Sequence, residues 1–341
     1  LSLLAIALAL VLLPVTSALV GDSGQLVAAF CLGLAGYASC FAIRGDLSGR
    51  NELGRYGRML WIEGVVRLLG LGSLAALDLV SLAACGWLFA LAPWVAAVLS
   101  VARAPRARAP RARSTKPDGA RARLVAPILL LIPGALAAQL LVNAGPLVVS
   151  LLATPAERGQ AGVLLAALVL IRVPVFLFTA VQPTFLPAMS LHAANDRPDL
   201  FLRLLWRVLA VMVLFTVLSS LVMTTLGPLV VTLLFGFEEE LGRSAFLLLT
   251  VAAGLFLIAM VLAQSLIGLG RHAATTVGWL TGIAGLVVGT TLSEDLVTQA
   301  SLAFLAGAVV ATVAMAVQLW LRIRMARSPG HTGTEVAPRR S

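Results

Sequence analysis

Long runs of apolar residues, interrupted by short clusters of charged and turn-forming residues, make up most of this chain. A helix that crosses the hydrocarbon core of a bilayer needs about 20 consecutive apolar residues. Runs of that length predict ten membrane-spanning helices, and the predicted fold class is all-α, a polytopic membrane protein. The expected bounds of these spans are 1–20, 25–43, 59–80, 82–101, 124–152, 160–182, 205–226, 244–264, 273–291 and 297–321.

Composition agrees with the pattern, since 60% of the 341 residues are hydrophobic and only 12% are charged. The mean hydropathy of +1.00 lies well above that of a soluble domain, and it leaves little room for the architecture of a soluble enzyme. The cysteines have no paired spacing that would favour a metal site or a disulfide framework. The sequence also has no P-loop motif of an ATPase. We therefore expect no catalytic residues, no metal site and no cofactor.

The charge of the chain is unevenly distributed. There are 25 Lys and Arg residues against 15 Asp and Glu, and most of the basic ones lie in the loops on one side of the predicted spans. By the positive-inside rule that side is cytoplasmic, so both termini are expected to face the cytoplasm of a cell whose plasma or inner membrane holds the protein. The same distribution accounts for the basic balance without nucleic-acid binding.

One long basic segment divides the predicted spans into four and six. It alternates Arg with Ala and Pro, a composition that buries nothing and should remain solvated. Four spans followed by six indicate a duplicated transporter whose start is truncated, and the similar Gly54-Arg55-Tyr56 and Gly270-Arg271-His272 support parallel halves. The expected parts are an incomplete helical bundle (1–101), a cytoplasmic linker (102–123), a six-helix bundle (124–321) and a disordered cytoplasmic tail (322–341).

Proline and glycine interrupt two of the spans. Pro133-Gly134 and Gly145-Pro146 lie in the fifth span, and Pro174 lies in the sixth. Such positions predict either ordinary kinks or backbone that lines a cavity. An interfacial helix is expected to lead into the seventh span, with Asp196 or a neighbour as its cap and Pro198 in its first turn.

Charged residues inside the spans are the candidates for function, because each one is costly in the bilayer unless it has a partner or a cavity. Arg172 has no acidic neighbour on its own helix face. It either points into a central cavity and holds an anionic ligand, or donates a hydrogen bond to a carbonyl of another helix. Glu63 and Arg67 lie four residues apart, a spacing that favours an ion pair. Alternatively, Glu63 is a proton or cation site that competes with this pair.

Several short segments carry a resemblance to a known family. In the first half they are Arg44-Gly45, Gly54-Arg55-Tyr56-Gly57, Glu63-Gly64 and Arg67-Leu68. In the second half they are Ala161-Gly162, Arg172-Val173-Pro174, Leu186-Pro187 and Ser190. These segments resemble those of polysaccharide-biosynthesis flippases in the multidrug/oligosaccharidyl-lipid/polysaccharide exporter superfamily. The resemblance implies two six-helix halves, with this chain beginning at the third helix of the family.

The resemblance also implies a function, which is to flip a polyprenyl-diphosphate-linked oligosaccharide across the membrane. We expect Arg172, Arg67 and Asn143 to bind this substrate, Glu63 to couple ions, and Arg44, Arg55 and Arg271 to lie at cytoplasmic loops or a gate. Membrane lipids and polysaccharide assembly enzymes are the other expected partners. In the helix that follows the linker, relatives often carry an acidic residue soon after an asparagine. This chain has Asn143-Ala144-Gly145-Pro146 there, so we do not expect ion coupling at that position. Two other hypotheses remain open, a cation-coupled drug exporter of the same superfamily and a membrane glycosyltransferase or polymerase.

Overall fold

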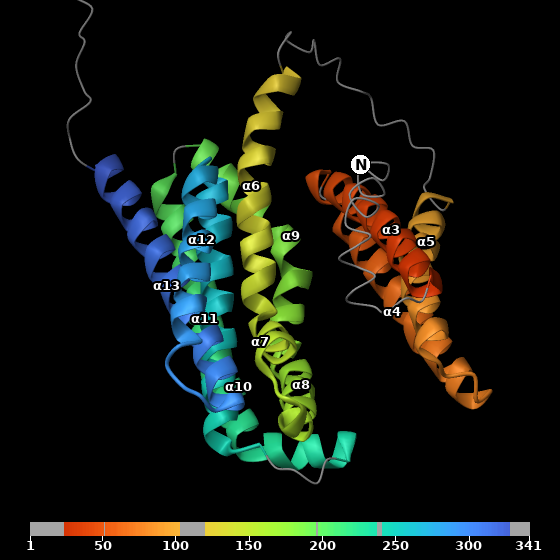
Figure 1. The fold of residues 1–341 in the computed structure, drawn as a ribbon. Coiled ribbons are helices and arrows are strands. Elements are labelled where there is room, and N and C mark those ends of the chain that lie inside the picture. Colours follow the sequence, from red (N-terminus) through yellow and green to blue (C-terminus); the bar gives the residue numbers. More distant parts are fainter. Residues whose placement is uncertain (1–23, 51, 103–119, 196, 237–240, 328–341) are drawn as a thin grey trace, which may run out of the picture. The chain divides into compact units, whose positions relative to one another are not determined.

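The computed structural model describes residues 24–50, 52–102, 120–195, 197–236 and 241–327 (Figure 1). Within these ranges all regular secondary structure is helical, which confirms the predicted fold class. The elements in chain order are α3 (Gly24–Gly49), α4 (Leu53–Ala76), α5 (Leu82–Ala102), α6 (Ala120–Val142), α7 (Ala144–Leu152), the 3-10 turn η1 (Pro155–Glu157), α8 (Arg158–Ile171), α9 (Val173–Ala194), α10 (Pro198–Phe235), α11 (Arg243–Gly268), α12 (His272–Gly289) and α13 (Leu296–Arg327).

The described helices account for every predicted span except 1–20, which lies outside the described residues. Within the described ranges, eight spans are long and apolar enough to cross a membrane, and the bent pair α6 and α7 makes a ninth. The chain is therefore a multi-pass membrane protein. The linker and tail predictions fall largely on 103–119 and 328–341, outside the described residues. At their edges α6 already begins at Ala120, and α13 continues past the expected end of its span to Arg327.

The chain divides into two compact units, Leu1–Thr115 and Lys116–Ser341. In the first unit, α5 packs against both α3 and α4. Small residues allow the close approach of α3 to α5, as membrane helices often require. A Cβ added at Gly36 would lie only 2.7 Å from Nε1 of Trp94, and this indole donates a hydrogen bond to the Leu32 carbonyl at 3.0 Å.

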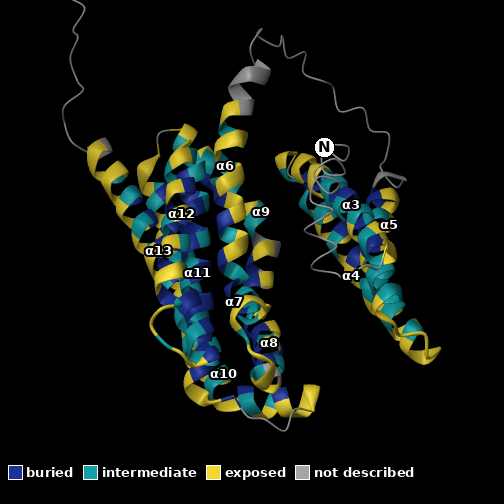
Figure 2. Ribbon diagram, in the orientation of Figure 1, coloured by how far each residue is buried: buried dark blue, intermediate teal, exposed yellow. Residues whose placement is uncertain are grey.

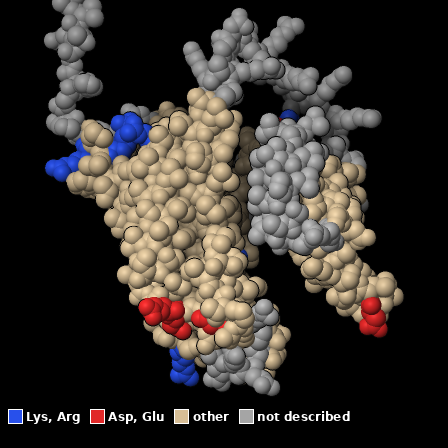
Figure 3. Space-filling model, viewed as in Figure 1, with Lys and Arg blue, Asp and Glu red and all other residues tan. Residues whose placement is uncertain are grey.

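The second unit is organised around α11, which packs against α9, α10 and α13, while α12 packs on α13 and α6. Buried residues concentrate along α11, and exposed residues cover much of the outer surface of its neighbours (Figure 2). Many of those exposed residues are apolar, for example Leu218, Leu221 and Leu233 of α10. On the face shown in Figure 3, nearly all visible charged side chains of this unit lie towards its two ends. An apolar exterior between charged ends is the surface of a bundle embedded in lipid.

Two predicted spans are broken near their middle. The span expected over 124–152 is the pair α6 and α7, bent by 68°, with Asn143 between the two helices. The span expected over 160–182 changes from α8 to α9 at Arg172. Proline explains the second break, because Pro174 in the first turn of α9 has no N–H to continue the ladder of α8.

The region before the seventh span also differs from the prediction. The interfacial helix and the span form one helix, α10, over Pro198–Phe235. Pro198 lies in its first turn, as predicted, and Arg197 occupies the cap position without a side-chain cap hydrogen bond. Asp196, the expected cap, lies outside the described residues.

A local cap precedes α8, at a turn outside the spans. The backbone N–H and the hydroxyl of Thr154 both donate to Oε2 of Glu157, at 2.8 and 2.6 Å. The hydroxyl bond, followed by the backbone bond, holds the pKa of the Glu157 carboxyl below its usual value. Only half of a capping box is present, because the Glu157 carboxylate accepts from the Thr154 backbone while the Thr154 hydroxyl donates to the same carboxylate.

Candidate functional site

The first group of polar side chains in the spans surrounds Glu63 on α4. Glu63 is only 5% exposed, and its two oxygens accept charge-assisted hydrogen bonds from Arg44 of α3 and Arg67 of α4. The Arg67 guanidinium also donates to the hydroxyl of Tyr37 and lies over the ring of Phe89 of α5, 5.1 Å from its centroid. We refer to Tyr37, Arg44, Glu63 and Arg67 as the Glu63 cluster.

The Glu63 cluster carries an excess of positive charge. Two guanidinium groups face one carboxylate, and both carboxylate oxygens are occupied. The two arginines are not equivalent, since the Arg44 side chain is 9% exposed and that of Arg67 is 25% exposed. Arg67 is therefore the accessible cation of the cluster, whereas Arg44 is held inside it.

The expected pairing of Glu63 with Arg67 is confirmed, but the predicted place of Arg44 is wrong. Arg44 was expected in a cytoplasmic loop after a span ending at residue 43, and it lies inside α3, which continues to Gly49. The predicted span ended before Arg44 because that residue is charged. A charged residue with a buried partner can lie inside a helix, as Arg44 does. The partner is 19 residues away in the sequence and on another helix, so periodicity gave no signal for it.

The other two residues expected at cytoplasmic loops lie at helix starts. Arg55, in the first turn of α4, pairs with Glu52 at i,i+3 spacing, and both side chains are about one-third exposed. Arg271 occupies the cap position of α12, where it is exposed and has no ion-pair partner among the described residues. A gating role for either residue stays a prediction.

A second group joins the two helix breaks. Arg172, between α8 and α9, donates from Nη2 to the carbonyl of Val142 at 2.7 Å. Val142 is the last residue of α6, directly before Asn143, whose amide donates to the Gln139 carbonyl at 2.8 Å. The structure thus brings Arg172 next to Asn143 at the bend. We refer to Arg172, Val142 and Asn143 as the break site.

The break site pairs a guanidinium group with a carbonyl at the end of a helix. The last carbonyls of a helix have no partner within the helix, and they carry partial negative charge. A guanidinium at this position satisfies one carbonyl and remains charged. The hydrogen bond to another helix, one of the two possibilities for Arg172, is therefore present. Its Nε is buried without a partner among the described residues, and binding of an anion stays a prediction.

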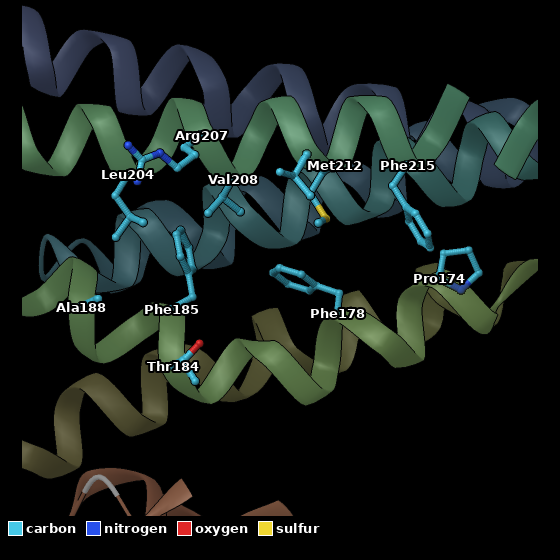
Figure 4. A pocket seen from close by; sticks show the side chains of 11 residues that line it. Pro174, Phe178, Thr184, Phe185, Ala188, Leu204, Arg207, Val208, Met212 and Phe215 are labelled. Atoms are coloured by element: carbon cyan, nitrogen blue, oxygen red, sulfur yellow. The ribbon is translucent and has the colours of Figure 1, made fainter. Parts of the chain in front are cut away.

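A third feature is a groove between α9 and α10, with a volume of about 480 Å³ (Figure 4). Its walls are apolar except for Thr184 and Arg207. Sequence reasoning did not identify it, because it arises where two helices separate in space. The lining residues are Pro174, Phe178, Thr184, Phe185, Ala188, Leu204, Arg207, Val208, Val211, Met212 and Phe215.

No grouping of three His, Cys, Asp or Glu side chains that could hold a metal ion occurs among the described residues. None of the arrangements above places a nucleophile beside a general base. What they offer instead is guanidinium groups within apolar helices, suited to holding or moving an anionic group.

Comparison with known proteins shows a likeness of fold. No family model and no curated protein matches the chain. Among solved structures, the chain is similar to a crystal structure of a mutant of the Vibrio cholerae MATE transporter VcmN, with a TM-score of 0.64 and 14% sequence identity over 95% of this chain and 77% of that one. The chain therefore has the fold of a membrane transporter.

Proposed function

We propose that this protein is a flippase that carries a polyprenyl-diphosphate-linked oligosaccharide from the inner to the outer leaflet for surface polysaccharide assembly. The observation that supports this substrate best is that Glu63 is buried and paired with two arginines. Glu63 is the one buried carboxylate among the described residues, and two arginines neutralise it. The charge left over inside the spans is therefore positive, which favours an anionic substrate over a cationic one.

In this proposal Arg67 of the first unit and Arg172 of the second are each candidates to hold the diphosphate. Guanidinium groups match phosphate oxygens bidentately and stay charged in a dry cavity. Arg67 is the more exposed arginine of the Glu63 cluster, and Arg172 retains an unused buried donor at Nε. Asn143, at the adjacent helix break, supplies an amide for the substrate beside Arg172.

Glu63 is proposed to couple transport to protons. A proton on the Glu63 carboxyl removes its charge and weakens the bonds from Arg44 and Arg67 together. The side chain of Arg67 is then free to bind phosphate, and loss of the proton restores the ion pair, so the protonation of Glu63 and the availability of Arg67 are linked. Transport would proceed by alternating access in the cell membrane. Coupling to the protonation of Glu63 requires no nucleotide and no cofactor.

The test measures lipid-linked oligosaccharide and its leaflet in cells with and without the gene, using a glycosidase that does not cross the membrane. Without the gene, the intermediate should build up where the glycosidase cannot reach it, and surface polysaccharide should fall. Arg67→Gln should reproduce this defect. Arg50→Gln is the matched control, because Arg50 pairs with Asp46 at the exposed end of α3, with both side chains about 60% exposed.

The second candidate is a cation-coupled drug exporter, which the likeness to a MATE transporter favours. A cationic drug would need the Glu63 carboxylate to be freed from its arginines. In that case Glu63→Gln would abolish drug resistance while the lipid-linked intermediate is flipped normally. An intermediate that is never made in cells without the gene would instead indicate a glycosyltransferase or polymerase, and the flippase proposal would fail.

A further inference from the structure

The two ends of the groove between α9 and α10 differ, since one is charged and the other is apolar. Arg207 and Leu204 of α10 lie at one end, beside Ala188 of α9, and Pro174 and Phe215 lie at the other (Figure 4). Apart from Thr184, the walls between the two ends are apolar side chains. A ligand that fits this groove is therefore a chain of hydrocarbon with one negative end.

The length of the groove matches one leaflet of a bilayer. On α10 its lining positions run from Leu204 to Phe215, which corresponds to about 16 Å at about 1.5 Å per residue. The hydrocarbon core of a bilayer is about 30 Å thick, so one leaflet contributes about 15 Å. A single acyl chain of one leaflet has the length to fill the groove from end to end.

The charged end has the composition of a membrane interface. Arg207 is exposed and has no ion-pair partner among the described residues. Trp206 beside it is 67% exposed, and Arg203 lies one turn earlier on α10. Tryptophan and arginine gather at the level of lipid head groups, where basic residues attract anionic lipids.

We propose that the groove between α9 and α10 binds an anionic phospholipid of the bilayer, with one acyl chain along the groove and the phosphate on Arg207. The proposal does not depend on the transported substrate. Besides Arg207, only Thr184 adds a polar side chain to the lining, so the groove offers little to a glycan and no carboxylate to a cationic drug. A phospholipid held there would bridge α9 and α10 at one membrane interface.

The test uses the full chain, purified in detergent and freed of lipid, and counts bound lipid by native mass spectrometry. Phosphatidylglycerol and phosphatidylcholine with the same acyl chains are compared. Wild-type protein should prefer phosphatidylglycerol, and Arg207→Gln should reduce this preference about fivefold, the effect of one basic residue at a membrane surface. Arg203→Gln is the matched control, because Arg203 is exposed on the same helix but does not line the groove.

A second pair of variants tests the apolar part of the groove. Val211 lines the groove and is 53% exposed, whereas Val213 does not line it and is 48% exposed. Since both side chains lie at the surface, tryptophan at either position should leave the fold intact, which size-exclusion chromatography verifies. Val211→Trp should fill the groove and abolish the bound phospholipid, and Val213→Trp should not.

Three results would overturn the proposal. Equal losses in Arg207→Gln and Arg203→Gln would show general attraction to a basic surface. Normal binding by Val211→Trp would place the lipid elsewhere. Displacement of phosphatidylglycerol by an equal concentration of polyprenyl phosphate would make the groove a site for the lipid carrier of the proposed substrate, and not for a bilayer phospholipid.

Discussion

At the scale of single residues, the arginines inside the spans differ in what compensates them. Arg44 and Arg67 share the carboxylate of Glu63, whereas Arg172 faces a backbone carbonyl with only partial negative charge. Breaking a buried ion pair by removing one member is costly, because the remaining charge is left in an apolar environment. The consequences of substitution should therefore depend on which member is removed.

For the Glu63 cluster we predict an asymmetry. Glu63→Gln leaves the buried Arg44 and the partly exposed Arg67 without a carboxylate, and should destabilise the protein by about 3–5 kcal/mol. Arg44→Gln leaves Glu63 paired with Arg67, so its cost should be clearly smaller. Thermal unfolding of both variants in the same detergent measures the difference. Equal losses of stability would mean that Arg67 alone does not neutralise Glu63.

For the break site, Arg172→Ala should abolish export while the protein remains in the membrane. The variant should also lose stability by about 1–3 kcal/mol, since the Val142 carbonyl loses its hydrogen-bond donor. Surface polysaccharide and the amount of protein in the membrane fraction are the two measurements. Arg172→Lys, which retains the charge and one donor, should keep most of the stability. Normal polysaccharide with Arg172→Ala would leave Arg172 as a cap for α6 and remove it from substrate binding.

At the scale of helices, close packing depends on small residues as much as on apolar ones. A Cβ added at Gly289 of α12 would lie 2.6 Å from the Ala303 Cα and the Leu302 carbonyl oxygen of α13. These are backbone atoms, so the helices themselves would have to separate. At Gly72 of α4 an added Cβ meets nothing within 4 Å. The same substitution should therefore have opposite effects at the two positions.

We predict that Gly289→Ala lowers the unfolding temperature and that Gly72→Ala leaves it unchanged or raises it. The second effect reflects the helix propensity of alanine, which exceeds that of glycine by about 1 kcal/mol in a helix interior. Intrinsic tryptophan fluorescence during heating in detergent reports both, with expression of each variant as the control. A stable Gly289→Ala protein would show that α12 and α13 can move apart without cost.

At the scale of the whole molecule, the spans and the loop charges together predict how the chain lies in the membrane. The basic loops before α4 and α12 and the end of α13 should face the cytoplasm, and the acidic turn between α12 and α13 should face outwards. This orientation determines which side of the membrane can reach the Glu63 cluster from the ends of α3 and α4.

Fusions to alkaline phosphatase, which is active only outside the cytoplasm, check this orientation. A fusion after Ser293 should be active, whereas fusions after Gly270 and after Ser341 should be inactive. Fusions to green fluorescent protein at the same positions should give the opposite pattern and serve as the control. Activity after Ser341 would invert the predicted topology, and with it the direction of transport.

The spans and the pair of Glu63 and Arg67 were predictable because each depends on residues close in sequence. Apolar runs decide insertion into the bilayer, Pro174 marks a helix start, and an i,i+4 spacing places two side chains on one helix face. In this way the sequence alone predicted the all-helical class and the approximate positions of the spans within the described residues. The bilayer, a uniform apolar solvent, leaves few other choices to such segments.

The polar contacts between different helices depend on the tertiary structure. Arg44 reaches Glu63 from another helix, Arg172 reaches a carbonyl 30 residues away, and the groove that ends at Arg207 exists only where α9 and α10 separate. Local pattern cannot specify these contacts, because they depend on how helices rotate and bend against one another. A charge in a membrane without a partner on its own helix must find one through that packing. The bilayer therefore makes the helices predictable from sequence but does not specify the contacts between them.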